Sequence, residues 1–120
     1  MAEEIIKLKA LCLRQPWANL ITTGQKTIET RKWKTDYRGW ILLTTSRRPE
    51  IGPFGCAVAI AYLWHIERMT KEHEGAAMTK VYNKAYSWFL RDVMPIRPIP
   101  VKSKLLLFDV ELKWSELEFQ

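Results

Sequence analysis

The sequence lacks a long apolar run, an internal repeat and a low-complexity tract. Its longest apolar stretch, 56–64, has the length of a strand and is far shorter than the roughly 18 residues that span a bilayer. The first ten residues carry two glutamates and no basic region followed by an apolar one. We therefore expect no secretory signal and no membrane partner.

Cysteine is scarce, and neither of the two cysteines belongs to a metal-binding pattern. Cys12 and Cys56 both lie in apolar, strand-like segments, which predicts buried free thiols in a reducing compartment. The sequence has none of the paired CxxC or Cys/His spacings that hold zinc, so we expect no metal and no cofactor. Together with the missing signal, this predicts a cytoplasmic protein.

The positive charge is concentrated in one part of the chain. The formal net charge is +6, and the segment 14–48 holds eight basic residues against two acidic ones, while the remainder is balanced. Three of the six tryptophans, Trp17, Trp33 and Trp40, lie in the same segment. Because cations meet phosphates and aromatic rings stack on unpaired bases, the segment predicts a polyanionic partner. RNA, another single-stranded nucleic acid or a nucleotide-like small molecule would fit, and nothing predicts an oligomeric state.

Length and patterning favour one domain over residues 1–120, mainly β with α (α+β). Strands are expected over 7–14, 26–31, 40–45, 56–66 and 105–112 and within 81–90, a helix over 16–23 closed by Gly24, and a helical or irregular exposed segment over 69–77. The three prolines of MPIRPIP, 94–100, predict a crossing loop or an edge. These elements indicate a small, partly closed β-barrel of five or six strands with short helices, although an open α+β sandwich fits the periodicity almost as well.

The stretch GQKTIETRKW, 24–33, contains the strongest candidate binding residues. Lys26 and Arg31 suit a phosphate, and Arg31 also suits a base edge. Glu29 can accept from a base amino group or hold Arg31, two positions along on the same strand face. The alternation places Lys26 on the opposite face. A solvated Lys26–Glu29 pair worth less than about 1 kcal/mol is the alternative.

Further candidates for ligand binding are polar, aromatic or basic: Gln15, Trp17, Thr45, Arg47, Arg48 and Trp88. The amide of Gln15 suits a base edge, and the two tryptophans offer ring faces for stacking. Thr45 ends a strand just before the two arginines, which predicts a phosphate shelf. A core position for Trp17, a merely exposed arginine loop and a cross-strand pair of Trp33 with Trp40 are the structural alternatives.

The order of these motifs resembles the ASCH domain family, a branch of the PUA-like β-barrels. LCLRQPWANLITTGQKTIETRKW, 11–33, is similar to the family signature, with Gln-Pro-Trp opening a helix ahead of Gly-x-Lys-x-x-Glu-x-Arg. YRGWILLTTSRRP, GCAVAIAYL and YSWFLRDVMPIRPIPVKSKLLLFDVEL resemble its later segments, so the likeness spans roughly 8–112. It implies a PUA-like barrel with a cleft beside the first helix, floored by the motif strand, and binding of RNA or other nucleic acid.

Catalysis is an open alternative. Some free-standing family members hydrolyse an amide of a modified cytidine. Their active sites are typified by a Lys-x-x-Thr motif and a distant glutamate. Here the third position after Lys26 is Glu29, which argues against that activity, although Thr30 shares a strand face with Lys26. A ribonuclease would use Lys26, Glu29, Arg31 and Tyr37 as base, acid and charge stabilisers. The leading hypothesis is nucleic-acid binding in a basic cleft, and the alternative is an enzyme in which Lys26 and Glu29 are catalytic.

Overall fold

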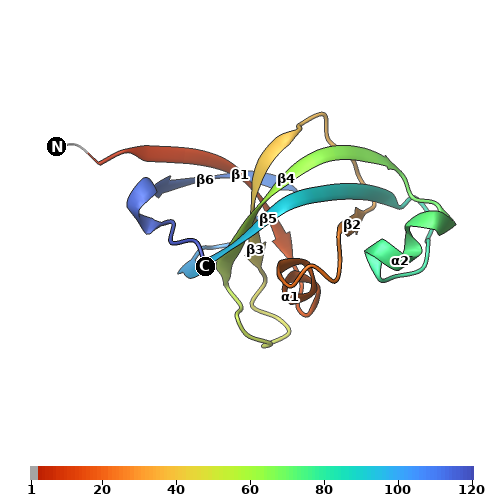
Figure 1. Ribbon diagram of the computed structural model, residues 1–120, viewed down its shortest axis with the longest axis horizontal. Helices are drawn as coiled ribbons and strands as arrows, with labels where there is room; N and C mark the ends of the chain where they lie inside the picture. Colours follow the sequence, from red (N-terminus) through yellow and green to blue (C-terminus); the bar gives the residue numbers. More distant parts are fainter. Residues whose placement is uncertain (1–2) are drawn as a thin grey trace.

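The structure is a computed structural model that describes residues 3–120, and it is built on one six-stranded sheet (Figure 1). Its strands are β1 (Ile5–Leu13), β2 (Ile28–Arg31), β3 (Gly39–Thr45), β4 (Cys56–Arg68), β5 (Tyr86–Pro100) and β6 (Leu107–Lys113). The order across the sheet is β2-β5-β4-β3-β1-β6, with β1 parallel to β3 and the other neighbours antiparallel. The sheet curls without closing, because β2 and β6 remain its two edges. The expected mainly β fold with short helices is confirmed.

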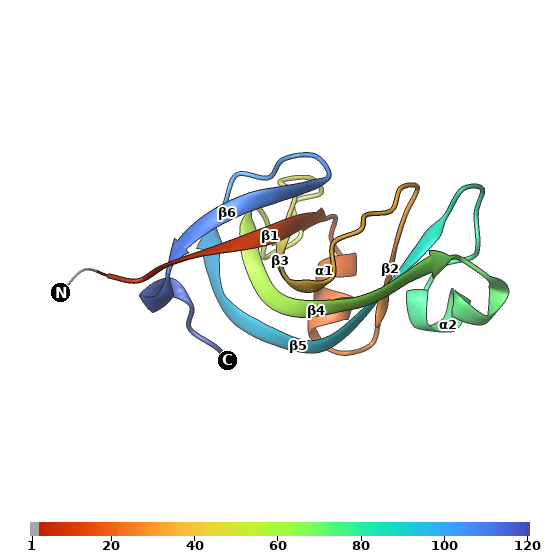
Figure 2. The same cartoon turned by 90° about the horizontal axis from the view of Figure 1, so that it is seen from above.

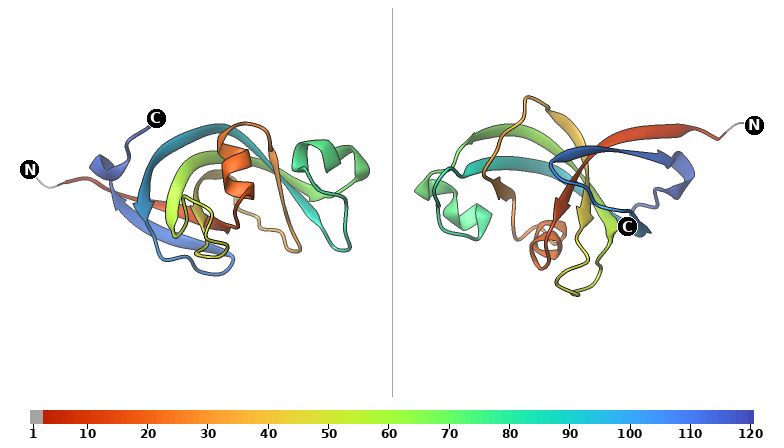
Figure 3. Two further views of the ribbon diagram at one scale, coloured as in Figure 1. Left: turned by 90° about the horizontal axis from the view of Figure 1, so that it is seen from below. Right: turned by 180° about the vertical axis from the view of Figure 1, so that it is seen from behind.

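The helices are short and flank the curved sheet. They are α1 (Trp17–Thr22), α2 (Glu74–Ala77) and the 3₁₀ turns η1 (Lys71–His73) and η2 (Trp114–Glu116). Figures 2 and 3 show β4 and β5 bending around α1, while α2 lies beyond β2 at one end of the molecule. Across residues 3–120, none of the helices has the length and apolar character needed to cross a bilayer.

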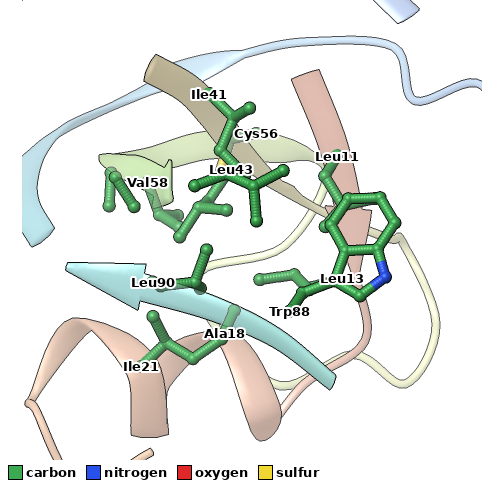
Figure 4. Packing of buried hydrophobic residues seen from close by; sticks show 13 residues of the cluster. Leu11, Leu13, Ala18, Ile21, Ile41, Leu43, Cys56, Val58, Trp88 and Leu90 are labelled. Carbon is green, nitrogen blue, oxygen red and sulfur yellow. The ribbon is translucent and has the colours of Figure 1, made fainter. Parts of the chain in front are cut away.

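The main core lies between α1 and the concave face of the sheet. Ala18 and Ile21 of α1 are fully buried, and they face buried strand residues such as Leu13 and Leu90 (Figure 4). Alternation decides which strand residues take part: Leu11 and Leu13 enter this cluster, whereas Ala10 packs on the opposite face of the sheet. Both faces of the sheet therefore carry a buried apolar cluster.

A glycine turn after α1 decides where the motif segment lies. Gly24 has φ +84°, a left-handed conformation that suits glycine, and its N–H donates to the carbonyl of Ile21 at 3.0 Å. The expected C-terminal glycine is thus present. The backbone N–H of Lys26 then donates to the carbonyl of Leu20 at 2.9 Å, and β2 begins only at Ile28. Lys26 precedes the strand, so the expected strand over 26–31 begins too early.

The proline-rich segment 94–100 is part of β5, so the expectation of a crossing loop is wrong. The alternative expectation, an edge, is right for this half of the strand. β2 pairs with β5 only between Tyr86 and Phe89, and beyond that point the side of β5 away from β4 meets the C-terminal residues through an isolated bridge of Ile96 with Phe119. Proline is tolerated here because the N–H that this bridge uses belongs to Arg97, whereas Pro95 supplies a carbonyl. Register shifts between β4 and β5 mark β-bulges that help both long strands bend.

Candidate functional site

An open cavity of about 220 Å³ lies between the end of β1, the start of α1, strand β2 and the chain after α2. It is lined by Arg14, Trp17, Lys26, Glu29, Thr30, Arg31 and Thr79. We call it the signature cavity, because the three charged residues of the Gly-x-Lys-x-x-Glu-x-Arg motif meet there. Its lining holds three cations and one carboxylate, so its formal charge is positive and favours an anion over a cation.

Lys26 is buried in the wall of this cavity, with only 2% of its surface exposed. Its Nζ donates a hydrogen bond to the carbonyl of Ala77 and lies 3.6 Å from Oε1 of Glu29. The same atom is 5.2 Å from the centroid of the Trp17 ring, within the range of a cation–π contact. The alternative of a solvated Lys26–Glu29 pair is wrong, because both side chains are shielded from water.

Glu29 and Arg31 form the ion pair that strand alternation predicts. Oε2 of Glu29 accepts from Nη2 of Arg31 at 3.0 Å, while Oε1 accepts from the backbone N–H of Thr30 at 3.1 Å. Nη2 of Arg31 also donates to the carbonyl of Cys12 at 2.6 Å, which ties β2 to β1 across the curled sheet. The Nε of Arg31 is buried and has no hydrogen-bond partner within residues 3–120. A ligand cannot reach that buried atom, but no hydrogen bond within residues 3–120 uses Nη1 of Arg31, so this nitrogen keeps donor capacity for a ligand.

Burial is the main reason why the pKa of Lys26 lies below the ordinary lysine value of 10.5. The carboxylate of Glu29 opposes that shift, and the charge of Arg31 adds to it. The ammonium thus has less solvation than a surface lysine, and Glu29 holds it in its charged form. This combination suits a group that pairs with an anion or moves a proton.

The lowered pKa predicts how stability depends on pH. Between the pKa of Lys26 in the folded protein and 10.5, the unfolded chain binds more protons than the folded one. The free energy of unfolding contributed by Lys26 should therefore rise with pH across that window. We expect the wild type to gain more stability than Lys26→Met between neutral pH and pH about 10, as measured by urea unfolding at a series of pH values.

Lys71→Met supplies the matched control, because Lys71 is an exposed lysine on η1. Its pH profile should parallel that of the wild type. Equal slopes for the wild type and Lys26→Met would show that the folded state does not disfavour the ammonium at this position.

Two of the expected ligand-binding residues have structural roles instead. Gln15 is 2% exposed, and its amide bonds the carbonyl of Pro53 at 2.8 Å and both the side chain and the backbone N–H of Asn19. Trp88 is completely buried, its ring meets that of Trp33 edge-on at 4.8 Å, and its Nε1 donates to the Trp33 carbonyl at 3.2 Å. Neither side chain is free to meet a ligand in this structure.

The other expected residues divide between two places. Trp17 is 37% exposed and lines the signature cavity, so it is not a core residue. Thr45 is buried and its hydroxyl bonds the backbone of Cys56, but it lies with Arg47 at a separate cavity. Arg48 is exposed and lines neither cavity.

Further aromatic assignments need correction. Trp33 and Trp40 do not pair with each other: Trp33 packs on Trp88, and Trp40 packs on Tyr62 at 5.1 Å. The hydroxyl of Tyr37 donates to the Trp40 carbonyl at 2.7 Å, and Tyr37 is not part of the signature cavity lining. Its part in a ribonuclease site is therefore unsupported.

Three lining residues of the signature cavity were not expected to bind a ligand. Arg14 could have been identified from the sequence as a ligand-binding candidate, since it directly follows the alternating β1 segment and is the first residue of the basic segment. Strand alternation suggests Thr30 only as a partner of Lys26, and in the structure its hydroxyl accepts from that of Tyr82 at 3.0 Å. Thr79 had no local signal, because only the fold brings the chain after α2 to β2.

Comparison with known proteins identifies the family. The family model of the ASCH domain matches residues 11–100. The crystal structure of ASCH from Zymomonas mobilis superposes with a TM-score of 0.62 at 21% identity, covering 90% of this chain and 89% of that one. A serine-to-alanine variant of that protein gives 0.63 at 20% identity, with 90% and 89% covered, and a tyrosine-to-phenylalanine variant gives 0.62 at 20%, with 90% and 91%.

At these identities the structural likeness shows the fold alone, and no curated protein sequence matches the chain. The family model, by contrast, covers most of the sequence and includes the motif residues that meet at the signature cavity. The earlier resemblance is confirmed: this chain belongs to the ASCH domain family.

Proposed function

We propose that this chain binds single-stranded RNA, or a nucleotide-like ligand, in the signature cavity. The observation that supports the proposal most is the convergence of Lys26, Glu29 and Arg31 on one open, cation-rich cavity beside a half-exposed tryptophan. The ASCH family is associated with binding of RNA and other nucleic acids, which agrees with this chemistry.

Each side chain has a distinct part in the proposed binding. Arg31 directs its remaining donors to a phosphate, since Nη2 is already held by Glu29 and Cys12. Lys26 supplies a desolvated charge, which attracts an anion more strongly than a hydrated one does. Trp17 offers apolar ring surface to a base, a contact worth about 1–3 kcal/mol when stacking is complete.

Loss of the two motif cations should abolish tight binding. We expect Lys26→Met and Arg31→Ala each to weaken binding of a fluorescein-labelled, single-stranded RNA hexamer of random sequence by at least about tenfold, because a hydrogen bond to a charged group contributes roughly 1.5–3 kcal/mol. Fluorescence anisotropy at 50–200 mM salt measures the affinity, which should fall steeply as salt rises.

Lys32→Ala is the matched control for this measurement. Lys32 is exposed, adjoins Arg31 in the sequence and does not line the signature cavity. Lys32→Ala therefore removes the same charge as Arg31→Ala at a position outside the cavity. Circular dichroism confirms that each variant is folded. Equal affinities for Arg31→Ala and Lys32→Ala, or no binding of any oligonucleotide by the wild type, would refute the proposal.

A catalytic role is the second candidate, and the lowered pKa of Lys26 is the observation that favours it. A buried amine that loses its proton more readily than a surface lysine can act as a general base. The hydroxyl of Thr30 lines the same cavity, although it already accepts from Tyr82. Chromatography of the incubated RNA and of acylated cytidine separates the candidates: product that disappears in Lys26→Met supports an enzyme, and saturable binding without product supports a binding domain.

A further inference from the structure

Two further cavities extend the signature cavity along the surface. The middle cavity, of about 350 Å³, shares Arg14 and Arg31 with the signature cavity and adds Ser103 and Lys104. The loop cavity, of about 240 Å³, shares Ser103 with the middle cavity and continues past Lys102 to Arg47. Because neighbouring cavities share wall residues, the three lie next to one another along one path on the surface.

This path carries most of the unbalanced charge of the protein. Six cations line it: Arg14, Lys26, Arg31, Arg47, Lys102 and Lys104. Glu29 is the one carboxylate among the lining residues, so the path has a formal charge of +5 in a chain of net charge +6. Among residues 3–120, no acidic residue lines the middle or the loop cavity. Such a stripe attracts a chain of negative charges rather than a single one.

Four of these cations form no ion pair with a described carboxylate. Within residues 3–120, no carboxylate lies within 4.0 Å of the basic groups of Arg14, Arg47, Lys102 or Lys104. Asp109 pairs with Lys7 and Lys9 instead. Its pKa is lowered mainly by the hydrogen bond from Lys9, with a smaller effect from the charge of Lys104. None of the four cations is held in an ion pair, so they are available to an external anion.

The volumes of these cavities favour a polymeric ligand of which only a part enters each cavity. The signature and loop cavities are smaller than the roughly 300–1,000 Å³ of sites that enclose a whole small molecule. The signature cavity alone offers an aromatic ring together with buried polar groups, so it suits one unpaired base. Beside it, Leu105 is 90% exposed at the rim of the middle cavity and gives apolar surface to a neighbouring base.

We propose that the three cavities form one track for a single strand of RNA, about three nucleotides long, with one base in the signature cavity and successive phosphates at Arg14 with Arg31, at Lys104, and at Lys102 with Arg47. This inference rests on the proposed function and adds the substrate class: a strand, not a free nucleoside or mononucleotide. Duplex RNA is excluded from the track, because its bases are paired and cannot enter the signature cavity.

Competition against the labelled hexamer tests the track. A random single-stranded trimer should compete at least about tenfold better than an equimolar mixture of the four nucleoside 5′-monophosphates, because it adds phosphate contacts. Lys102→Ala with Lys104→Ala should weaken hexamer binding about three- to tenfold and reduce the slope of log affinity against log salt by about 1.4, or about 0.7 for each lost phosphate contact. Mononucleotide affinity should change less than twofold, since the signature cavity is intact.

Lys71→Ala with Lys80→Ala is the matched control, with the same loss of charge at exposed positions outside the three linings. If trimer and monophosphates compete equally, or if the two double variants behave alike, the track is refuted while dependence on Lys26 and Arg31 still supports the signature cavity. If no RNA binds, the proposed function fails as well. If polyphosphate or an RNA duplex competes as well as the single-stranded hexamer, the surface is a non-specific polyanion site and the track is refuted.

Discussion

Glu29→Ala should lower the free energy of unfolding by about 3 kcal/mol near pH 7. The carboxylate of Glu29 lies between two cations, 3.6 Å from Nζ of Lys26 and 3.0 Å from Nη2 of Arg31. Removing one partner of a buried ion pair costs roughly 3–5 kcal/mol, because the remaining charge is left without compensation. We expect the lower part of this range, because the side chain of Arg31 is 24% exposed and water can solvate it.

The ion pairs of Glu29 with Lys26 and Arg31 also predict that the stability effects of substitutions among these residues are not additive. Lys26→Met removes a desolvated charge and leaves Glu29 with Arg31, so it should cost less than Glu29→Ala. The double variant should recover part of the loss, since one of the two uncompensated cations is then absent. Glu29→Gln, which keeps the shape and an acceptor for the N–H of Thr30, should fall between the wild type and Glu29→Ala.

Urea unfolding at pH 7 gives these free energies. The pKa of Lys26, followed by NMR of the labelled lysine, should fall further in Glu29→Ala, because the group that raises it is gone. A change below about 1 kcal/mol in Glu29→Ala, together with an unaltered pKa of Lys26, would show that the carboxylate does not hold the two cations in solution.

Trp88→Ala should destabilise the protein by about 3–5 kcal/mol, the usual cost of truncating a fully buried aromatic residue. The ring packs in the main core and edge-on against Trp33, and its Nε1 donates to the carbonyl of Trp33. Truncation would leave a cavity beneath β5, remove the aromatic contact and leave that carbonyl without this donor. Trp88→Phe keeps much of the packing and should cost clearly less.

Trp17→Ala is the contrasting variant, because Trp17 is half-exposed at the signature cavity. It should cost about 1 kcal/mol in unfolding but weaken RNA binding, while Trp88→Phe should leave binding close to that of the wild type. Urea unfolding and fluorescence anisotropy measure the two effects. Comparable losses of stability in Trp17→Ala and Trp88→Ala would contradict the burial that separates these tryptophans.

Most of the strands could be predicted because their sequence pattern follows burial. β3, β4 and β6 begin or end within about two residues of the expected limits, since apolar runs and alternation mark the faces that meet the core. The second half of β5 could not be predicted, because the number of prolines in a segment does not show which segments lie beside it. Whether a proline is tolerated depends on the neighbouring segments: β2 is short, and the C-terminal residues meet this half of β5 through one isolated bridge.

In the candidate site, too, some features could be predicted from the sequence and others could not. The pair of Glu29 with Arg31 followed from a period of two along one strand. The position of Lys26 did not, because its Nζ bonds the carbonyl of Ala77, which is 51 residues further along the chain. Gln15 and Trp88 had the right chemistry for a ligand, but residue type does not reveal whether neighbouring segments already use the polar groups or cover the ring.

The sequence by itself determined the family, the mainly β architecture and the motif that carries the charged residues, because these depend on local order and spacing. Only the tertiary structure decided which cations share one surface. Lys102 and Lys104 lie outside the basic segment of the sequence, and the curl of the sheet brings the chain between β5 and β6 beside Arg14 and Arg31. Burial, ion pairing and the adjacency of cavities all depend on contacts between segments that are distant in the sequence. Only the folded structure therefore decides them.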